Sequence, residues 1–127
     1  MKKLFKLLFT RQTCTAGFNI SQPHNLTAAD PDKDGLTLFD LTLNNDVVLE
    51  GLDITEYIVS YFPTEKMAHA NKNAYAAPWK YTNSIPKKEF VFVRVSSRVN
   101  LEEYTIASFS LTAIADFSRI NTYDMVF

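Results

Sequence analysis

Three aspartates at alternate positions, Asp30, Asp32 and Asp34, are the residues whose types and spacing most directly indicate chemistry. They belong to the stretch DPDKDG, which matches the first half of a calcium-binding loop, D-x-[DN]-x-[DN]-G. In such a loop a glutamate at the twelfth position completes the ligand set, but this chain has Leu41 there. A tight polar turn explains the same residues, since Pro31 and a closing glycine favour turns. Both interpretations stay open, and the missing ligand favours the turn.

Candidate catalytic side chains are few and lie far apart in the sequence. Cys14 is the single cysteine, and His24 and His69 are the two histidines. None of them has neighbours typical of a nucleophile with its base, and two isolated histidines make a poor zinc site. Three glycines also leave little with which to build a phosphate loop or a dinucleotide fingerprint. We therefore predict that the protein is not an enzyme and has no cofactor, unless the aspartates bind Ca²⁺.

Residues 89–117 supply the elements on which the rest of the chain must pack. This stretch has the longest run of β-branched and aromatic residues in the sequence, and it predicts two strands that pair as a hairpin. One face of the first strand is apolar, with Val91, Val93 and Val95. Its other face carries apolar and cationic residues, so we expect a second sheet or another subunit to cover it. These residues are Phe90, Phe92, Arg94 and Arg98.

The second half of this hairpin has an alternative interpretation. Apolar residues between 101 and 120 also recur at helical spacing, which is compatible with a helix. Thr, Ile, Ser and Phe dominate the stretch, and these types favour a strand with a bend near Ala107–Ser108.

Shorter elements precede the hairpin. Alternation predicts strands over residues 36–43, 47–49 and 54–62, and Thr64 is a candidate cap for a helix over 64–73. An irregular loop with Trp79 and Tyr81 follows, and the tail TYDMVF predicts an edge strand. The fold class that results is mainly β: a small antiparallel β-sandwich, jelly-roll-like, with one short helix and an extended N-terminal arm.

Length and composition fit one small domain. The chain has 127 residues, of which 46% are hydrophobic, and a mean hydropathy of −0.10. This is enough to bury a core without metals or disulfides. A single cysteine cannot form an internal disulfide, and a lone thiol suits a reducing compartment.

Charge is unevenly distributed along the chain. Residues 1–29 carry four basic residues and no acid, whereas residues 30–56 carry eight acids and one lysine. These segments could pair within a molecule or between neighbours, or form two solvated faces. The overall net charge of −1 argues against binding to nucleic acid, except through the basic arm.

The N-terminal segment predicts the domain organisation. MKKLFKLLF begins like a secretory signal, but Lys6 interrupts its apolar run and no small residues follow for cleavage. No run approaches the roughly 20 apolar residues of a membrane span. We therefore expect residues 1–29 to form a basic N-terminal arm and residues 30–127 a β-sandwich domain. The alternative is that the N-terminal segment forms a strand and loop on its own core.

Together these features predict a structural or interaction subunit of a symmetric macromolecular assembly, most plausibly a bacteriophage virion protein such as a capsid accessory or head-to-tail connector component. Its location would be the virion, or the host cytoplasm during assembly. Its partners would be other protein subunits, copies of itself included. The alternative is a calcium-dependent or carbohydrate-binding β-sandwich module that uses the aspartates with the Trp79 loop. The predicted partner-binding residues are Leu4, Phe5, Leu8, Phe9, Arg11, Trp79, Tyr81 and Phe127.

Overall fold

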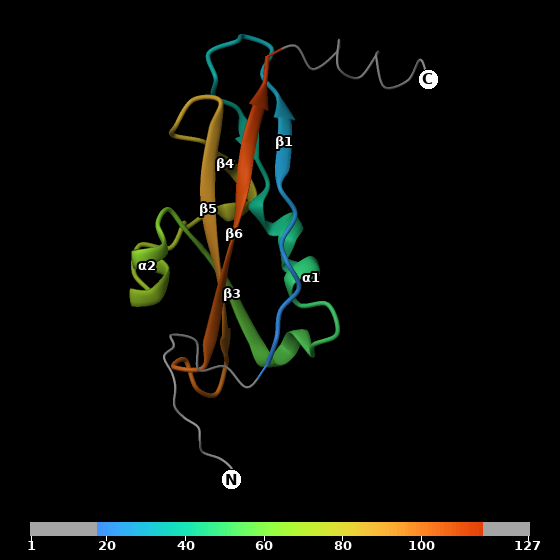
Figure 1. Ribbon diagram of the computed structural model, residues 1–127, viewed down its shortest axis with the longest axis vertical. Coiled ribbons are helices and arrows are strands. Elements are labelled where there is room, and N and C mark those ends of the chain that lie inside the picture. The colour runs from blue at the N-terminus through green and yellow to red at the C-terminus, as the bar shows by residue number, and fades with distance from the viewer. Residues whose placement is uncertain (1–17, 116–127) are drawn as a thin grey trace.

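The computed structural model describes residues 18–115, which form a mainly β domain (Figure 1). Four strands make a mixed sheet in the order β1-β6-β5-β3, which curls into a half-barrel, and two short strands, β2 and β4, make a second sheet. The strands are β1 (Leu26–Ala29), β2 (Leu38–Phe39), β3 (Tyr57–Phe62), β4 (Tyr81–Thr82), β5 (Lys88–Ser97) and β6 (Tyr104–Ile114). Short helical segments connect them: η1 (Leu41–Asn44), α1 (Asn45–Val48), η2 (Ile54–Glu56), α2 (Glu65–Ala70) and η3 (Pro78–Lys80).

The predicted hairpin is the long antiparallel pair β5 and β6. Its register runs from Lys88 opposite Thr112 to Ser96 opposite Tyr104. The strand interpretation of the second half is confirmed as far as Ile114, and no bulge interrupts the pairing at Ala107 and Ser108. The three alternating valines of β5 are fully buried, as the period-two pattern predicts.

The prediction of an antiparallel sheet is wrong at one edge. Strand β1 pairs with β6 in parallel, with Leu26 opposite Leu111 and Ala29 opposite Ile114. The four residues of β1 fall within the segment 1–29 assigned to the arm, and β1 joins the sheet edge by pairing with residues more than 80 positions later. No local pattern specifies such a long-range pairing. The described strands form one curled sheet with a small second sheet, so the architecture is not a clear sandwich.

Three predicted strands are shorter or absent, and at two of them a side-chain cap starts a helical turn. Within residues 36–43 only the two residues of β2 form a strand. The carboxylate of Asp40 accepts the N–H of Thr42 at 3.0 Å, and this contact begins η1. Residues 47–49 lie in and after α1 and form no strand. In the same way Asp53 accepts the N–H of Thr55 at 3.0 Å, so η2 replaces the start of the strand predicted from residue 54.

The predicted short helix is confirmed as α2. The hydroxyl of Thr64 accepts the N–H of Met67 at 3.1 Å, which caps the helix start. The helix ends at Asn71, whose φ of 56° lies in the left-handed region.

The core lies on the face of the four-stranded sheet that η1, α1 and β2 cover. The rings of Tyr61 and Phe109 meet edge to face at a centroid distance of 6.0 Å. The other buried hydrophobic members are Phe39, Leu41, Val48, Leu49, Val91, Val93, Val95 and Leu111.

The opposite side of β5 is covered by α2, which contacts β3, β5 and β6 (Figure 1). Arg94 is only 4% exposed there. Its guanidinium donates to the carbonyls of Ala68, His69 and Leu101 at 2.8, 3.1 and 2.8 Å. It also lies 3.7 Å from the ring centroid of Tyr104. Within the described residues, part of the outward face is therefore covered by the domain's own helix, and Phe90 stays 54% exposed.

We expect Arg94→Ala to lower the free energy of unfolding by about 2–3 kcal/mol, because it removes several hydrogen bonds worth about 1 kcal/mol each. Arg98→Ala is the matched control. Arg98 is exposed, although it also donates to backbone carbonyls, so its loss should cost less than about 1 kcal/mol. Urea unfolding followed by circular dichroism measures both. Equal losses in the two variants would show that Arg94 does not hold α2 on the sheet.

Candidate functional site

The three aspartates lie in the loop that follows β1. The backbone N–H of Asp30 donates to the carbonyl of Ile114 at 3.0 Å, so the β1–β6 ladder fixes the first aspartate in place. Lys33 then donates its N–H to the carbonyl of Asp30 at 3.1 Å and has a φ of 59°. The loop is therefore a closed turn at the end of the sheet, as the turn interpretation predicts.

The side chains of this loop converge. One carboxylate oxygen of each of Asp30, Asp32 and Asp34 lies within 4.8 Å of the others. Asp30 is 2% exposed, and the other two are exposed. Oδ2 of Asp30 accepts the N–H of Gly35 at 2.6 Å, but its buried Oδ1 has no hydrogen-bond partner. Asp34 uses Oδ1 to accept the N–H of Leu36 at 2.9 Å. We call these three residues the aspartate cluster.

The close carboxylates perturb each other's pKa. Burial raises the pKa of Asp30, but polar contacts with the side chain of Asp32, the backbone of Gly35 and Asp34 outweigh it, so the pKa is lowered. The pKa of Asp32 is raised, chiefly by its hydrogen bonds with Asp30 and Asp34. Two neighbouring carboxylates repel each other unless a proton or a cation lies between them.

A second loop, residues 83–87 between β4 and β5, supports the aspartate cluster. The side chain of Asn83 donates to the carbonyl of Gly35 at 2.8 Å and accepts the N–H of Thr37 at 2.7 Å. The buried carboxylate of Glu89 in turn accepts the backbone N–H groups of Ser84 and Ile85 at 2.6 and 2.8 Å. Sequence patterns did not single out Asn83 or Glu89. The available signal for Glu89 was the alternation of β5, which places it on the same face as the buried Val91 and Val93.

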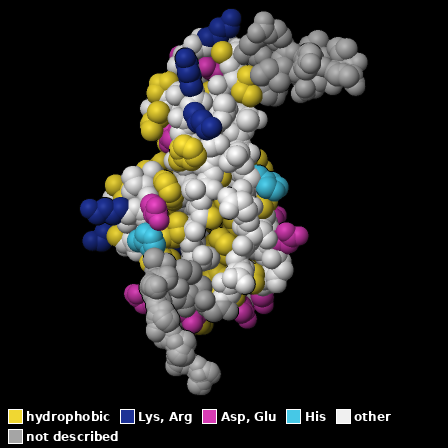
Figure 2. All heavy atoms as spheres, in the orientation of Figure 1, with side chains coloured by type: hydrophobic (Ala, Val, Ile, Leu, Met, Phe, Trp, Pro, Cys, Tyr) yellow, Lys and Arg dark blue, Asp and Glu magenta, His cyan; other side chains and the backbone are white. Residues whose placement is uncertain are grey.

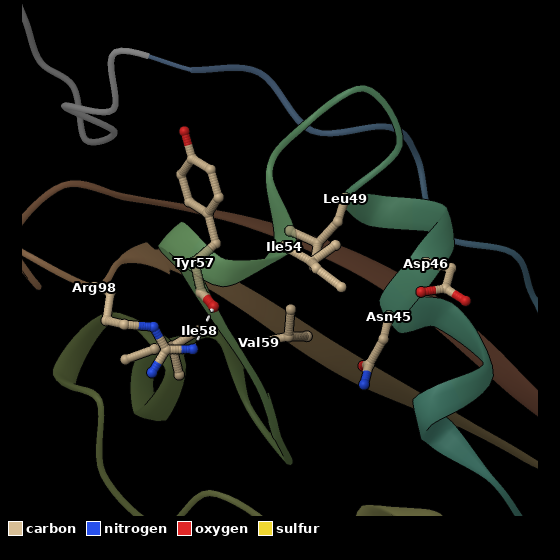
Figure 3. Close-up of a pocket in the computed structure, with 8 residues that line it drawn as sticks. All are labelled: Asn45, Asp46, Leu49, Ile54, Tyr57, Ile58, Val59 and Arg98. Carbon is tan, nitrogen blue, oxygen red and sulfur yellow. Dashed lines mark hydrogen bonds between the residues drawn. The ribbon is translucent and has the colours of Figure 1, made fainter.

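A hollow of about 430 Å³ lies between α1, η2 and β3, as Figure 3 shows. One of its walls is set by Asn45, whose side chain accepts the hydroxyl of Tyr61 at 2.6 Å. At the other end Arg98 donates to the carbonyls of Thr55 and Tyr57 at 3.0 and 3.1 Å. The lining contains no histidine, cysteine or serine, so it brings no nucleophile and base together. Its residues are Asn45, Asp46, Leu49, Ile54, Tyr57, Ile58, Val59 and Arg98.

Three exposed apolar side chains come from elements that contact one another. Leu38 in β2, Leu43 in η1 and Trp79 in η3 are 60%, 63% and 57% exposed, and η3 contacts both other elements. We call these residues the Trp79 surface. On the face drawn in Figure 2, lysine and arginine lie at one end of the sheet and over α2, and most acidic side chains lie toward the opposite end.

The other predicted site residues are placed differently or not described. Tyr81 is half-buried, and its hydroxyl donates to Glu89 and accepts from Tyr75. His24 lies beside Asn44, whereas His69 lies on α2 beside Tyr104, so the two histidines do not share a site. Cys14 and the remaining predicted partner-binding residues lie outside the described residues. These are Leu4, Phe5, Leu8, Phe9, Arg11 and Phe127.

Comparison with known proteins gives one finding. Residues 25–116 match the family model described as Flavobacterium inter-domain disulphide bond domain, and this match spans β1 to β6. No curated protein and no solved structure matches the chain. Between residues 18 and 115, no helix has the length and apolar character needed to cross a membrane.

The shape of the aspartate loop predicts different costs for two glycine substitutions. Gly35 and Gly51 both have a φ of +84°, but a Cβ at Gly35 would lie 2.8 Å from Cβ of Pro86, while one at Gly51 meets nothing within 4 Å. Gly51→Ala should therefore lower stability by about 1–2 kcal/mol from backbone strain alone. Gly35→Ala should cost about 1–3 kcal/mol more, because the second loop must shift. Thermal unfolding compares them, and equal melting temperatures would contradict the close packing of the two loops.

Proposed function

The chain belongs to this inter-domain disulphide bond domain family, and we propose that it is a non-catalytic structural subunit that assembles with copies of itself through the Trp79 surface. The observation that carries the proposal is the exposure of three large apolar side chains, Leu38, Leu43 and Trp79, on elements in contact. Tryptophan is among the residues most enriched in the energetically important centres of protein interfaces.

The energetics favour a protein partner for this surface. Fully burying one large apolar side chain stabilises an interface by about 1.5–3 kcal/mol, so the three together could supply several kcal/mol. A net charge of −1 leaves little long-range repulsion between copies. A second copy of the chain is therefore a suitable occupant of the surface.

The family description supports a role beside another protein domain, because it names a disulphide bond between domains. In these 127 residues the only cysteine is Cys14, which precedes the matched segment. Any such bond from these residues would have to use Cys14, and the Trp79 surface requires none.

The finer predictions go beyond this proposal. Membership of a bacteriophage virion, and location in the virion or host cytoplasm, stay predictions from sequence composition. The jelly-roll-like sandwich likewise stays a prediction.

A second candidate function, the calcium-dependent module, is favoured by one separate observation. Oδ1 of Asp30 is buried without a partner, beside two further carboxylates. This candidate concerns a different part of the domain from the Trp79 surface.

Self-association can be measured on the full chain, because Trp79 is its only tryptophan and reports directly on the proposed contact. As the protein concentration increases from about 1 µM to about 1 mM, we expect the sedimentation coefficient to rise and the Trp79 emission to shift to shorter wavelength. Both changes are expected when the dissociation constant lies within this range. Leu43→Asp should abolish both changes, since it places a charge in an apolar contact.

The matched control is Val99→Asp, which adds the same charge at a residue 94% exposed in the turn between β5 and β6. It should associate like the unmodified chain. A protein that stays monomeric with constant emission over this range, or equal effects of the two variants, would contradict assembly through the Trp79 surface.

A further inference from the structure

We propose that the aspartate cluster, Asp30, Asp32 and Asp34, binds one Ca²⁺ ion. Two independent observations support the site: the three carboxylates converge, and the most buried one has an oxygen that no donor reaches. The proposal does not rest on self-association through the Trp79 surface.

The spacing of the carboxylates fits a calcium ion. Oxygens bound to one Ca²⁺ at 2.3–2.6 Å can lie at most about 5 Å apart. The ligand oxygens of the cluster all lie within 4.8 Å of one another. Mg²⁺ binds at about 2.0–2.1 Å in a strict octahedron, which limits its ligands to about 4.2 Å. The flexible coordination of Ca²⁺ suits a loop with two exposed carboxylates better than the strict octahedron of Mg²⁺.

The buried Oδ1 of Asp30 is an acceptor that a bound cation can use. A buried polar atom without a partner costs free energy, and such atoms are rare in native proteins. Oδ2 is already used by Gly35, so Oδ1 is the atom left for an ion. A water molecule could donate to Oδ1, but it would leave the mutual repulsion of three carboxylates in place. A divalent cation satisfies the oxygen and removes the repulsion.

The surrounding bonds leave the other two ligands free to turn toward the ion. Oδ1 of Asp34 accepts the N–H of Leu36, which leaves Oδ2 available. Asp32 is exposed and is held by no backbone donor among the described contacts. The missing glutamate at the twelfth position leaves further coordination to water or backbone oxygens, so we expect the weaker affinity of extracellular-type modules, about 10⁻⁴–10⁻³ M.

Titration calorimetry and thermal unfolding of the full, chelator-treated chain with CaCl₂ test the site. We expect saturable heat at about one equivalent. For a dissociation constant near 0.1 mM, about 1 mM Ca²⁺ should raise the melting temperature by about 5 °C or more. Asp32→Asn should remove most of this shift, because it deletes a charged ligand that makes no backbone contact.

Asp46→Asn is the matched control, since Asp46 is an exposed acid on α1 outside the loop, and it should keep the full response. If Asp32→Asn fails to fold, Asp34→Asn replaces it, because its remaining Oδ1 can still accept the N–H of Leu36. No heat and no change in melting temperature at about 5 mM Ca²⁺, well above the expected dissociation constant, would overturn the proposal. So would an equal response of the ligand and control variants, or an equal shift with MgCl₂.

Discussion

Strand β5 imposes the constraint on which the other elements depend, because its side chains alternate between two faces that must both be satisfied. Its valines fill the core on one side. On the other side Arg94 is buried, and a buried cation requires acceptors, which the end of α2 and the β5–β6 turn provide. At the start of the strand, Glu89 requires donors, which the preceding loop provides. One strand therefore determines the positions of the core, the helix and the loop.

The same requirement extends from β5 to the aspartate cluster. Glu89 orders the loop that contains Asn83, Asn83 binds the carbonyl of Gly35, and Gly35 donates its N–H to Asp30. These contacts hold three carboxylates close together, although their repulsion opposes that arrangement. An ordinary turn needs a glycine and a polar residue, and not a buried carboxylate with an unused oxygen. The cost of keeping this geometry is the physical reason for expecting a cation there.

The sequence predicted correctly those elements that depend on residues close together in the chain. The alternation in β5, the Thr64 cap of α2 and the glycine-closed turn at Gly35 each depend on residues close in sequence. Predictions failed where short side chains captured backbone N–H groups, as at Asp40 and Asp53, since capping outweighed the alternating pattern. Contacts between distant residues were also missed, such as the parallel pairing of β1. The support of the acidic loop by Asn83 belongs to this class, because a bond across 46 residues leaves no local signal.

Strand β2 connects the aspartate cluster with the Trp79 surface. Thr37, which Asn83 holds in place, directly precedes Leu38, and Leu38 pairs with Thr82 shortly after Trp79. An ion that stiffens the loop would therefore also restrain one edge of the apolar surface, without contacting it. The surface contains no aspartate and the cluster no apolar side chain, so each can be altered alone. An effect of Ca²⁺ on self-association would have two short routes, β2 and the segment from Trp79 to Asn83 that contacts Gly35, and these are the places to look for coupling.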